Sequence, residues 1–272
     1  MKKNNKNLIL FIFMIAIVIL VFLGGYEYKD KIEKKLNIFY TNIETKIVEY
    51  VDTYVGVDYV STGGKTINCL GDSITEGYKN REISWADKIE PLVRAEKINK
   101  YGIGGSTVSD YVDEHPMCIR YSEMDDSADF IVIFAGNNDF TRSVPMGEPN
   151  DTNTKTFYGA LNTLLSGLRE KYPNGKFLYV TPLRMWNYAH PKWNEFVEYD
   201  KKNKVGKTLK DYRDAIISRC EYYEIPYLDL YNEGLYGRTE KTRNAVYIDG
   251  LHPNDEGHNI IASKIAGKLK MQ

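Results

Sequence analysis

Four short polar segments, spread along the 272-residue chain after residue 70, contain the residue types that nucleophilic catalysis by serine requires. Such a site needs a hydroxyl, a base that takes its proton, a carboxylate that orients the base, and amide donors where an oxyanion forms. Ser73, His252 and Asp249 could supply the first three groups in that order. The segments read GDSIT at 71–75, GGS at 104–106, GNND at 136–139 and DGLH at 249–252.

Each segment is weak evidence alone, because Ser, Gly and Asn between secondary elements are usually turn formers and Ser is also a preferred helix cap. The spacing of the last segment adds physical content. An Asp three residues before a His on a tight loop can fold back onto imidazole Nδ1 and leave Nε2 for the serine. A plain turn, capped by Asp249 and ended by Pro253, fits the same residues, and the two interpretations are compatible.

In their order and residue types, the four segments resemble the signature blocks of the SGNH, or GDSL, serine hydrolases, a family of esterases and lipases. The resemblance covers about residues 66–270. It implies a carboxylic ester hydrolase that needs no metal or organic cofactor, with Ser73 as nucleophile and His252 with Asp249 as the base pair. The α/β-hydrolase alternative is disfavoured, because its Gly-x-Ser-x-Gly elbow would require glycine where Thr75 stands.

The same resemblance assigns the oxyanion hole. Its donors would be the Ser73 amide, the Gly105 amide and the Asn138 side chain. Gly104 competes with Gly105 for the second block. We prefer Gly105, because the glycine of this family is usually followed closely by a small hydroxyl residue, as Ser106 is here.

The alternation of apolar runs and helical patterns after residue 66 predicts the fold. Strands are expected at 66–70, 99–103, 129–135, 176–181 and 225–230, and helices at 153–172, 205–223 and 255–270. Five strands with intervening helices predict a parallel sheet covered on both faces, a three-layer, flavodoxin-like α/β sandwich. Ser73, Gly105 and Asn138 directly follow the first three strands, so they should meet at the carboxyl edge, where such sheets bind ligands.

Residues 8–24 are uncharged, almost wholly apolar and long enough to cross a bilayer at about 1.5 Å per residue. No Ala-x-Ala cleavage site follows, which favours an uncleaved anchor over a signal peptide. We therefore expect a cytoplasmic leader at 1–7, a transmembrane signal anchor at 8–25, and a single-pass protein of the cell membrane. Lysines flank the span on both sides, and the short leader favours an extracellular catalytic domain.

Between the anchor and the hydrolase domain, expected at 61–272, apolar residues recur at steps of three and four from Ile32 to Tyr54. This spacing predicts a helix, and we expect a helical stalk and linker over 26–60. Such a stripe also suits packing on its own domain, self-association with a second chain, or contact with the membrane surface.

The overall composition fits one good-sized globular domain with an appendage, at 43% hydrophobic residues and a net charge of −1. A nucleic-acid partner is not expected from this charge. Cys69, Cys118 and Cys220 form neither a disulfide framework nor a metal-ligand spacing, so we expect buried thiols, with one pairing among the three left open.

Two other groups of residues allow more than one interpretation. Asp255, Glu256 and His258 could suggest a metal site, but they fall at the expected start of a helix, where acidic residues meet the dipole favourably. The aromatic group around Trp186 and Trp193, which also includes Met185 and Tyr188, could wall a cleft or form a local hydrophobic cluster. His115 and His190 are isolated and expected to be exposed.

The family resemblance combined with the expected surface placement implies a small-molecule or polysaccharide ester as substrate, most simply an O-acetyl ester of carbohydrate in a cell wall. A lysophospholipase or another lipid acylhydrolase could use the same triad, and so could an O-acetyltransferase acting on a cell-surface sugar. A catalytically inactive binding module would be expected to lack a motif residue, and none is missing.

Overall fold

The computed structural model describes residues 63–185, 201–233, 235 and 244–271. The predicted anchor and stalk, and the aromatic residues Trp186, Tyr188 and Trp193, lie outside this part of the chain, as does His190. Among the residues that are described, no helix combines the length and the apolar character that a membrane crossing would need.

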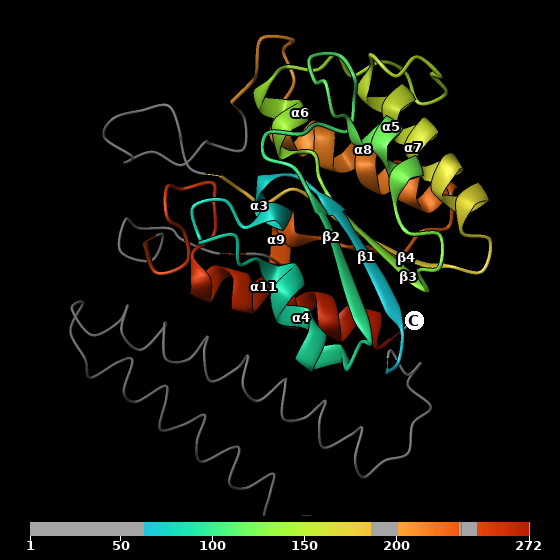
Figure 1. The fold of residues 1–272 in the computed structure, drawn as a ribbon. Coiled ribbons are helices and arrows are strands. Elements are labelled where there is room, and N and C mark those ends of the chain that lie inside the picture. Colours follow the sequence, from blue (N-terminus) through green and yellow to red (C-terminus); the bar gives the residue numbers. More distant parts are fainter. Residues whose placement is uncertain (1–62, 186–200, 234, 236–243, 272) are drawn as a thin grey trace, which may run out of the picture. The chain divides into compact units, whose positions relative to one another are not determined.

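Five parallel strands form one sheet in the described part of the chain (Figure 1), in the order β2-β1-β3-β4-β5. They are β1 (Thr66–Gly71), β2 (Lys97–Gly102), β3 (Phe130–Phe134), β4 (Lys176–Val180) and β5 (Tyr227–Leu228). This is the flavodoxin-like order, in which the winding direction switches between β1 and β3. The predicted α/β class and five-stranded parallel sheet are confirmed.

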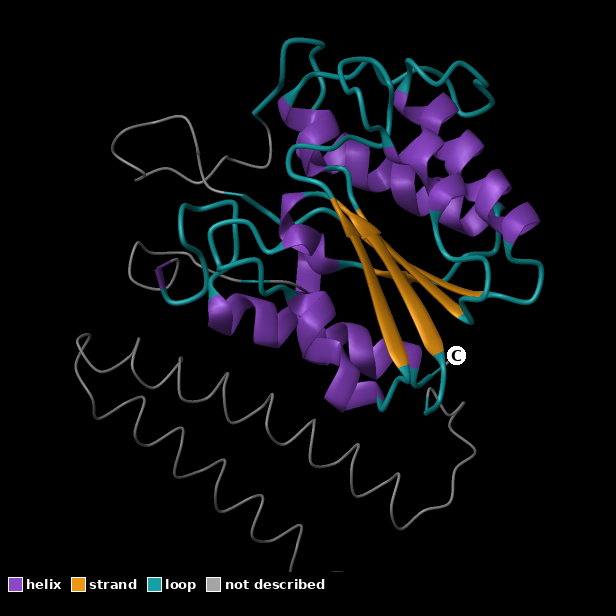
Figure 2. Cartoon of the chain, viewed as in Figure 1, coloured by secondary structure: helices purple, strands orange, loops and turns teal. Residues whose placement is uncertain are grey.

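Three long helices and one shorter helix cover the two faces of the sheet, as Figure 2 shows. Helices α7 (Phe157–Lys171) and α8 (Leu209–Tyr222) lie on one face, and α4 (Trp85–Val93) and α11 (Asp255–Leu269) on the other. Each begins at a polar residue whose side chain accepts a hydrogen bond from the first turn, which satisfies an otherwise unpaired amide. These caps are Ser84, Thr156, Thr208 and Asn254.

Shorter helices lie in the connections between strands. They are α3 (Ser73–Glu76), α5 (Met117–Arg120), the 3₁₀ turn η1 (Tyr121–Glu123), α6 (Asn137–Thr141) and α9 (Leu230–Glu233). Two of them, α3 and α6, begin within three residues of the ends of β1 and β3, and so carry the first residues beyond the carboxyl edge of the sheet.

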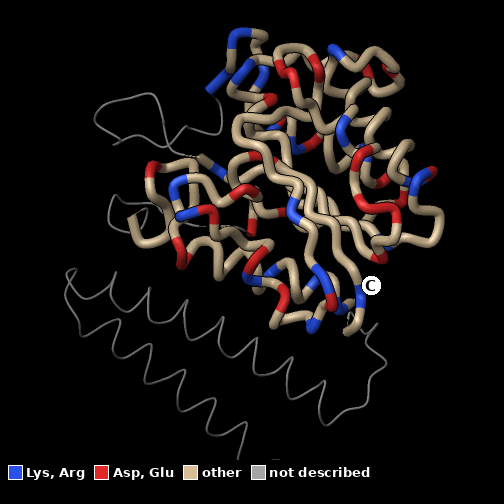
Figure 3. Tube along the Cα trace, in the orientation of Figure 1, with Lys and Arg blue, Asp and Glu red and all other residues tan. Residues whose placement is uncertain are grey.

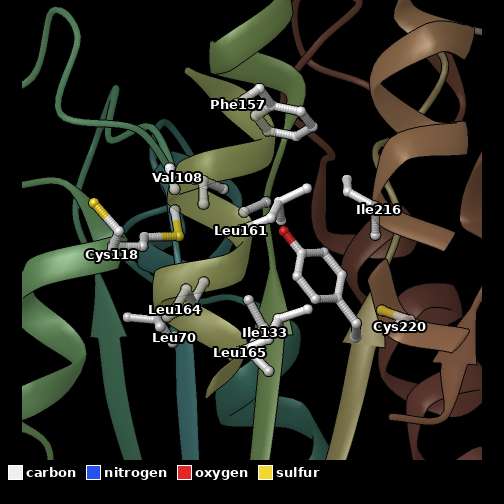
Figure 4. Close-up of a cluster of buried hydrophobic side chains, with 14 of the residues drawn as sticks. Leu70, Val108, Cys118, Ile133, Phe157, Leu161, Leu164, Leu165, Ile216 and Cys220 are labelled. Carbon is white, nitrogen blue, oxygen red and sulfur yellow. The ribbon is translucent and has the colours of Figure 1, made fainter. Parts of the chain in front are cut away.

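Strand β3 is buried on both faces, and its side chains alternate between two hydrophobic cores. Phe130, Val132 and Phe134 belong to the core beneath α4 and α11, whereas Ile131 and Ile133 belong to the core beneath α7 and α8. Figure 4 shows the second core, where Ile133 lies among leucines of α7 and residues of α8. Coverage on both faces explains why this strand is continuously apolar.

The structure corrects several sequence predictions. Helix α4 was not predicted; it is short, and Pro91 interrupts its pattern. The strand expected at 225–230 is reduced to two residues, because Leu230 already begins α9. The three cysteines are all free and buried, so the disulfide left open does not form.

Positively and negatively charged residues are interspersed along the described part of the chain, as Figure 3 shows. Some form ion pairs between elements. Lys100 of β2 pairs with Asp87 of α4, and Lys88 of α4 pairs with Asp255 of α11, each at 2.8 Å. The second pair joins α11 to α4, two helices that are far apart in the sequence.

Gly102→Ala should disturb the turn that carries Ser73, because a β-carbon at Gly102 would lie 2.2 Å from the Glu76 backbone nitrogen at the end of α3. Overpacking of this kind costs about 1–3 kcal/mol, which corresponds to a fall in Tm of roughly 3–10 °C. We expect this fall by calorimetry, with reduced ester hydrolysis.

Gly267→Ala is the matched control, because nothing lies within 4 Å of a β-carbon at this helical position. Its Tm should stay the same or rise slightly, since alanine favours helix. Equal Tm values for the Gly102→Ala variant and the wild type would show that the contact between β2 and α3 tolerates displacement.

Candidate active site

Ser73 lies in the turn between β1 and α3, at the carboxyl edge of the sheet. Asp72 caps α3, with its Oδ1 accepting a hydrogen bond from the Ile74 amide at 2.9 Å. Glycine is required at position 71, because a β-carbon there would lie 2.0 Å from Thr75 Oγ1. The tight turn holds the Ser73 side chain buried, directly facing His252.

His252 and Asp249 lie on a tight turn immediately before α11. The turn is closed by a bridge between Tyr247 and Pro253, and Gly250 provides its left-handed backbone at φ +86°. His252 Nδ1 lies 2.8 Å from Asp249 Oδ2, and His252 Nε2 lies 3.0 Å from Ser73 Oγ. Because the carboxylate accepts from Nδ1–H, the imidazole Nε2 is left to accept the proton of the serine hydroxyl.

Asp249 is held in its charged form. Burial opposes ionisation, but hydrogen bonds from the His252 side chain, the His252 amide and Lys79 outweigh it and hold the pKa of Asp249 well below its ordinary value. The carboxylate can therefore orient His252 and stabilise a positive imidazolium throughout the neutral pH range.

Asn138 lies in α6, directly after β3, and its side chain reaches across to the neighbouring loops. Its Nδ2 donates to the Ser106 carbonyl at 3.0 Å and to Asp72 Oδ2 at 3.4 Å. The carboxamide is thereby placed between the turn of Ser73 and the loop of Gly105.

The residues on either side of Asn138 fix two further loops, and sequence reasoning had not singled them out. Asn137 forms a pair of hydrogen bonds with the backbone of Leu183, after β4. Asp139 is fully buried and accepts from the amides of Val108 and Ser109. The available signal was a run of polar residues directly after a buried strand.

Gly105 follows β2 and has a left-handed backbone, with φ +75°, whereas Gly104 does not. The amides of Ser73 and Gly105 donate no hydrogen bond to any residue that the structure describes. Together with the Asn138 carboxamide, these amides come from the ends of three neighbouring strands and could converge on one oxyanion.

Two buried carboxyl groups support this arrangement. Burial raises the pKa of Asp72 to about 6 and that of Asp139 to about 7, although hydrogen bonds from backbone amides favour the charged form of each. Asp72 contacts the Asn138 side chain, and Asp139 anchors the loop after Gly105. Both groups therefore position the predicted oxyanion donors.

Arg120 is a second group that sequence reasoning missed. Its buried guanidinium donates to the carbonyls of Gly71, Tyr101 and His115, at 2.6, 2.8 and 3.0 Å. Burial lowers the pKa of Arg120 to about 10, so the side chain remains positively charged at neutral pH. It joins the ends of β1 and β2, and no motif in the sequence marks it.

The remaining candidate residues lie elsewhere. His258 is buried in α11, where its Nδ1 accepts from the Trp85 amide at 3.2 Å, and burial lowers its pKa to about 4. Met185 belongs to the hydrophobic core, whereas His115 is exposed. Within the described ranges, no three His, Cys, Asp or Glu side chains are grouped as metal ligands would be.

The fold and the site together define a serine hydrolase with a flavodoxin-like sheet. A serine hydroxyl, an imidazole and an ionised carboxylate form one hydrogen-bonded series, and the amides of Ser73 and Gly105 donate to no residue that the structure describes. The model of the GDSL-like lipase/acylhydrolase family matches residues 69–260, and the chain belongs to this family of carboxylic ester hydrolases.

The chain also resembles individual proteins in sequence or fold. YpmR of Bacillus subtilis (strain 168) is 22% identical over 221 residues, covering 76% of this chain and 82% of YpmR. A Lactobacillus plantarum protein of known structure is 32% identical, with a TM-score of 0.68 over 76% of this chain and 97% of its own. A mutant of Axe2, an acetyl-xylooligosaccharide esterase from Geobacillus, is 21% identical, with a TM-score of 0.54 over 77% and 96% of the two chains.

Alanine substitutions at Gly104 and Gly105 should separate the two candidates for the second signature block. At Gly105, a β-carbon would be strained by the left-handed backbone and would lie 2.7 Å from Arg142 Nη2. At Gly104, it would meet only the flexible end of the Glu76 side chain, at 2.8 Å. Alanine keeps the residue 105 amide, but the strain should displace this oxyanion donor, so we expect Gly105→Ala to lower kcat by up to about 100-fold and Gly104→Ala to have a much smaller effect.

Steady-state hydrolysis of a nitrophenyl acetate, with Tm measured in parallel, provides the comparison. A larger loss of kcat in the Gly104→Ala variant, at similar Tm, would transfer the oxyanion role to Gly104.

Proposed function

We propose that this protein is a membrane-anchored serine esterase that removes acyl groups, chiefly O-acetyl groups, from carbohydrate or cell-wall polysaccharide outside the cytoplasm. The catalytic part rests on one observation, the hydrogen-bonded series from Ser73 Oγ through His252 to Asp249, with contacts of 3.0 and 2.8 Å.

In the proposed mechanism, Ser73 Oγ bonds to the ester carbonyl carbon while its proton passes to His252 Nε2. The amides of Ser73 and Gly105 and the side chain of Asn138 hold the resulting oxyanion. The bond to the alcohol then breaks, and His252 returns the proton to the departing oxygen. Water attacks the acyl-enzyme in the same way, releasing the carboxylic acid and restoring the serine.

The preference for acetyl groups on carbohydrate is supported by two observations. Family membership supplies ester chemistry, and one protein with the same fold is an acetyl-xylooligosaccharide esterase. The proposed substrate class therefore rests on family membership, on this neighbour and on the proposed extracellular location, whereas the proposed reaction class rests on the triad itself.

A lipid acylhydrolase is the second candidate, and the surface beside the triad favours it. Tyr78, Ile103 and Ile248 are respectively 46%, 36% and 42% exposed, and each lies on a loop that carries catalytic residues. The Tyr78 ring also contacts the His252 ring at a centroid distance of 4.9 Å. Exposed apolar groups beside a reactive serine could bind a long acyl chain.

Ser73 should react covalently with a fluorophosphonate, because a serine beside a general base and oxyanion donors is activated for attack. Peptide mass spectrometry should locate the adduct on Ser73, and the Ser73→Ala variant should remain unlabelled with an unchanged Tm. An adduct on a different serine of the active protein would overturn the nucleophile assignment.

Acetyl esters should be hydrolysed faster than octanoyl esters in a nitrophenyl series of increasing acyl length. The lipid hypothesis gives the opposite order, because each methylene buried in an acyl pocket contributes about 0.8 kcal/mol to binding. A rise in kcat/KM with chain length would replace the acetyl proposal by the lipid one. Transfer of acetyl to an added sugar, in place of water, would indicate the O-acetyltransferase alternative.

The proposed anchor rests on the apolar run at 8–24, which is long enough to span a bilayer. Full-length protein should therefore sediment with membranes and resist extraction at high pH. Protease added to intact cells, or to protoplasts, should remove the catalytic domain and spare a cytosolic marker. Protection of the domain would reverse the orientation, and its release into the medium would show a cleaved signal peptide.

A further inference from the structure

Lys79 contacts Asp249, the carboxylate that orients His252, and the mechanism above does not use this contact. Its Nζ lies 2.8 Å from Asp249 Oδ2, the same oxygen that accepts from His252 Nδ1 at 2.8 Å. The other oxygen accepts from the amides of Leu251 and His252, at 3.1 and 2.8 Å. These four donors match the acceptor capacity of a carboxylate, so Asp249 divides its charge between an imidazole and a full cation.

The loop after α3 fixes Lys79 in this place. Gly77 and Lys79 both have left-handed backbones, at φ +90° and +62°, and amides of Asn80 and Glu82 bond back to the Gly77 carbonyl. This conformation is unfavourable for a residue with a side chain. The Tyr78 ring contacts His252, and Lys79 Nζ lies 5.6 Å from the centre of the Tyr78 ring. This loop therefore contacts both His252 and Asp249.

We propose that Lys79 is a positioning residue that sets the pH range in which His252 can act as a base. A cation on Asp249 stabilises the carboxylate and opposes the appearance of a second positive charge on the adjoining imidazole. As the pH falls, His252 should therefore remain neutral, and able to accept the Ser73 proton, down to a lower pH than it would if residue 79 were uncharged. This inference rests on the proposed role of His252 as general base.

Other ionisable groups also face His252. Asp72, at the start of α3, favours a protonated imidazole when charged, and burial raises its pKa to about 6. His258 of α11 adds little charge near neutrality, because burial lowers its pKa to about 4. Asp72 and His258 are the same in every Lys79 variant, so a comparison between variants isolates the contribution of Lys79.

The test is the rate of fluorophosphonate labelling of the full-length protein from about pH 5 to about pH 9, which needs no knowledge of the natural substrate. The acid limb of this profile reports protonation of the base. Lys79→Gln and Lys79→Met should move the limb upward by about one pH unit and label at nearly the wild-type rate at high pH. Lys79→Arg should keep the wild-type limb.

Lys97→Gln is the matched control, since it removes an exposed lysine whose ion pair with Asp125 lies at the other end of the sheet. Its limb should not move. If Lys79→Gln and Lys79→Met are labelled more slowly at every pH while the acid limb stays at its wild-type pH, Lys79 has only a structural role and the proposal is overturned. Absence of wild-type labelling at Ser73 would instead overturn the proposed function, and the Lys79 proposal with it.

Discussion

The site depends on three parallel strands that end level with one another. Gly71 at the end of β1 lies opposite Gly102 of β2 and Phe134 of β3. The three segments that follow these strands therefore leave the sheet side by side, about 4.8 Å apart. Since β1 lies between the other two, the serine turn is flanked by the glycine loop on one side and by α6 on the other. Three segments distant in sequence meet because the sheet has this register.

Beyond the strand ends, hydrogen bonds from buried polar side chains hold the loops in place, as backbone hydrogen bonds hold the strands of the sheet. Asp139 and Arg120 hold loops that have no regular structure, and Asp72 contacts the Asn138 side chain. The raised pKa values of the two carboxyl groups mean that the folded state holds their protons more tightly than the unfolded chain. Their contribution to stability is therefore complete below about pH 4 and is lost as pH rises to about 7.

The sequence could predict those parts of the molecule that depend on local pattern. Apolar runs located the strands, and the spacing of Asp249 and His252 predicted a turn in which the carboxylate reaches Nδ1, as the structure shows. The contacts of Arg120 and Lys79 could not be predicted in this way. Each joins residues that only the folded chain brings together, and a single Lys or Arg in a sequence has no distinguishing pattern.

The proposed reactive pair comes from distant parts of the domain's sequence, since Ser73 and His252 are 179 residues apart in the chain. The histidine turn leads directly into α11, whose first residue pairs with Lys88 of α4. A nascent polypeptide that already contains the whole sheet and the serine still lacks its base. Hydrolysis by this pair therefore requires synthesis to have passed residue 252, so that translation products ending before the histidine turn would be inert toward esters.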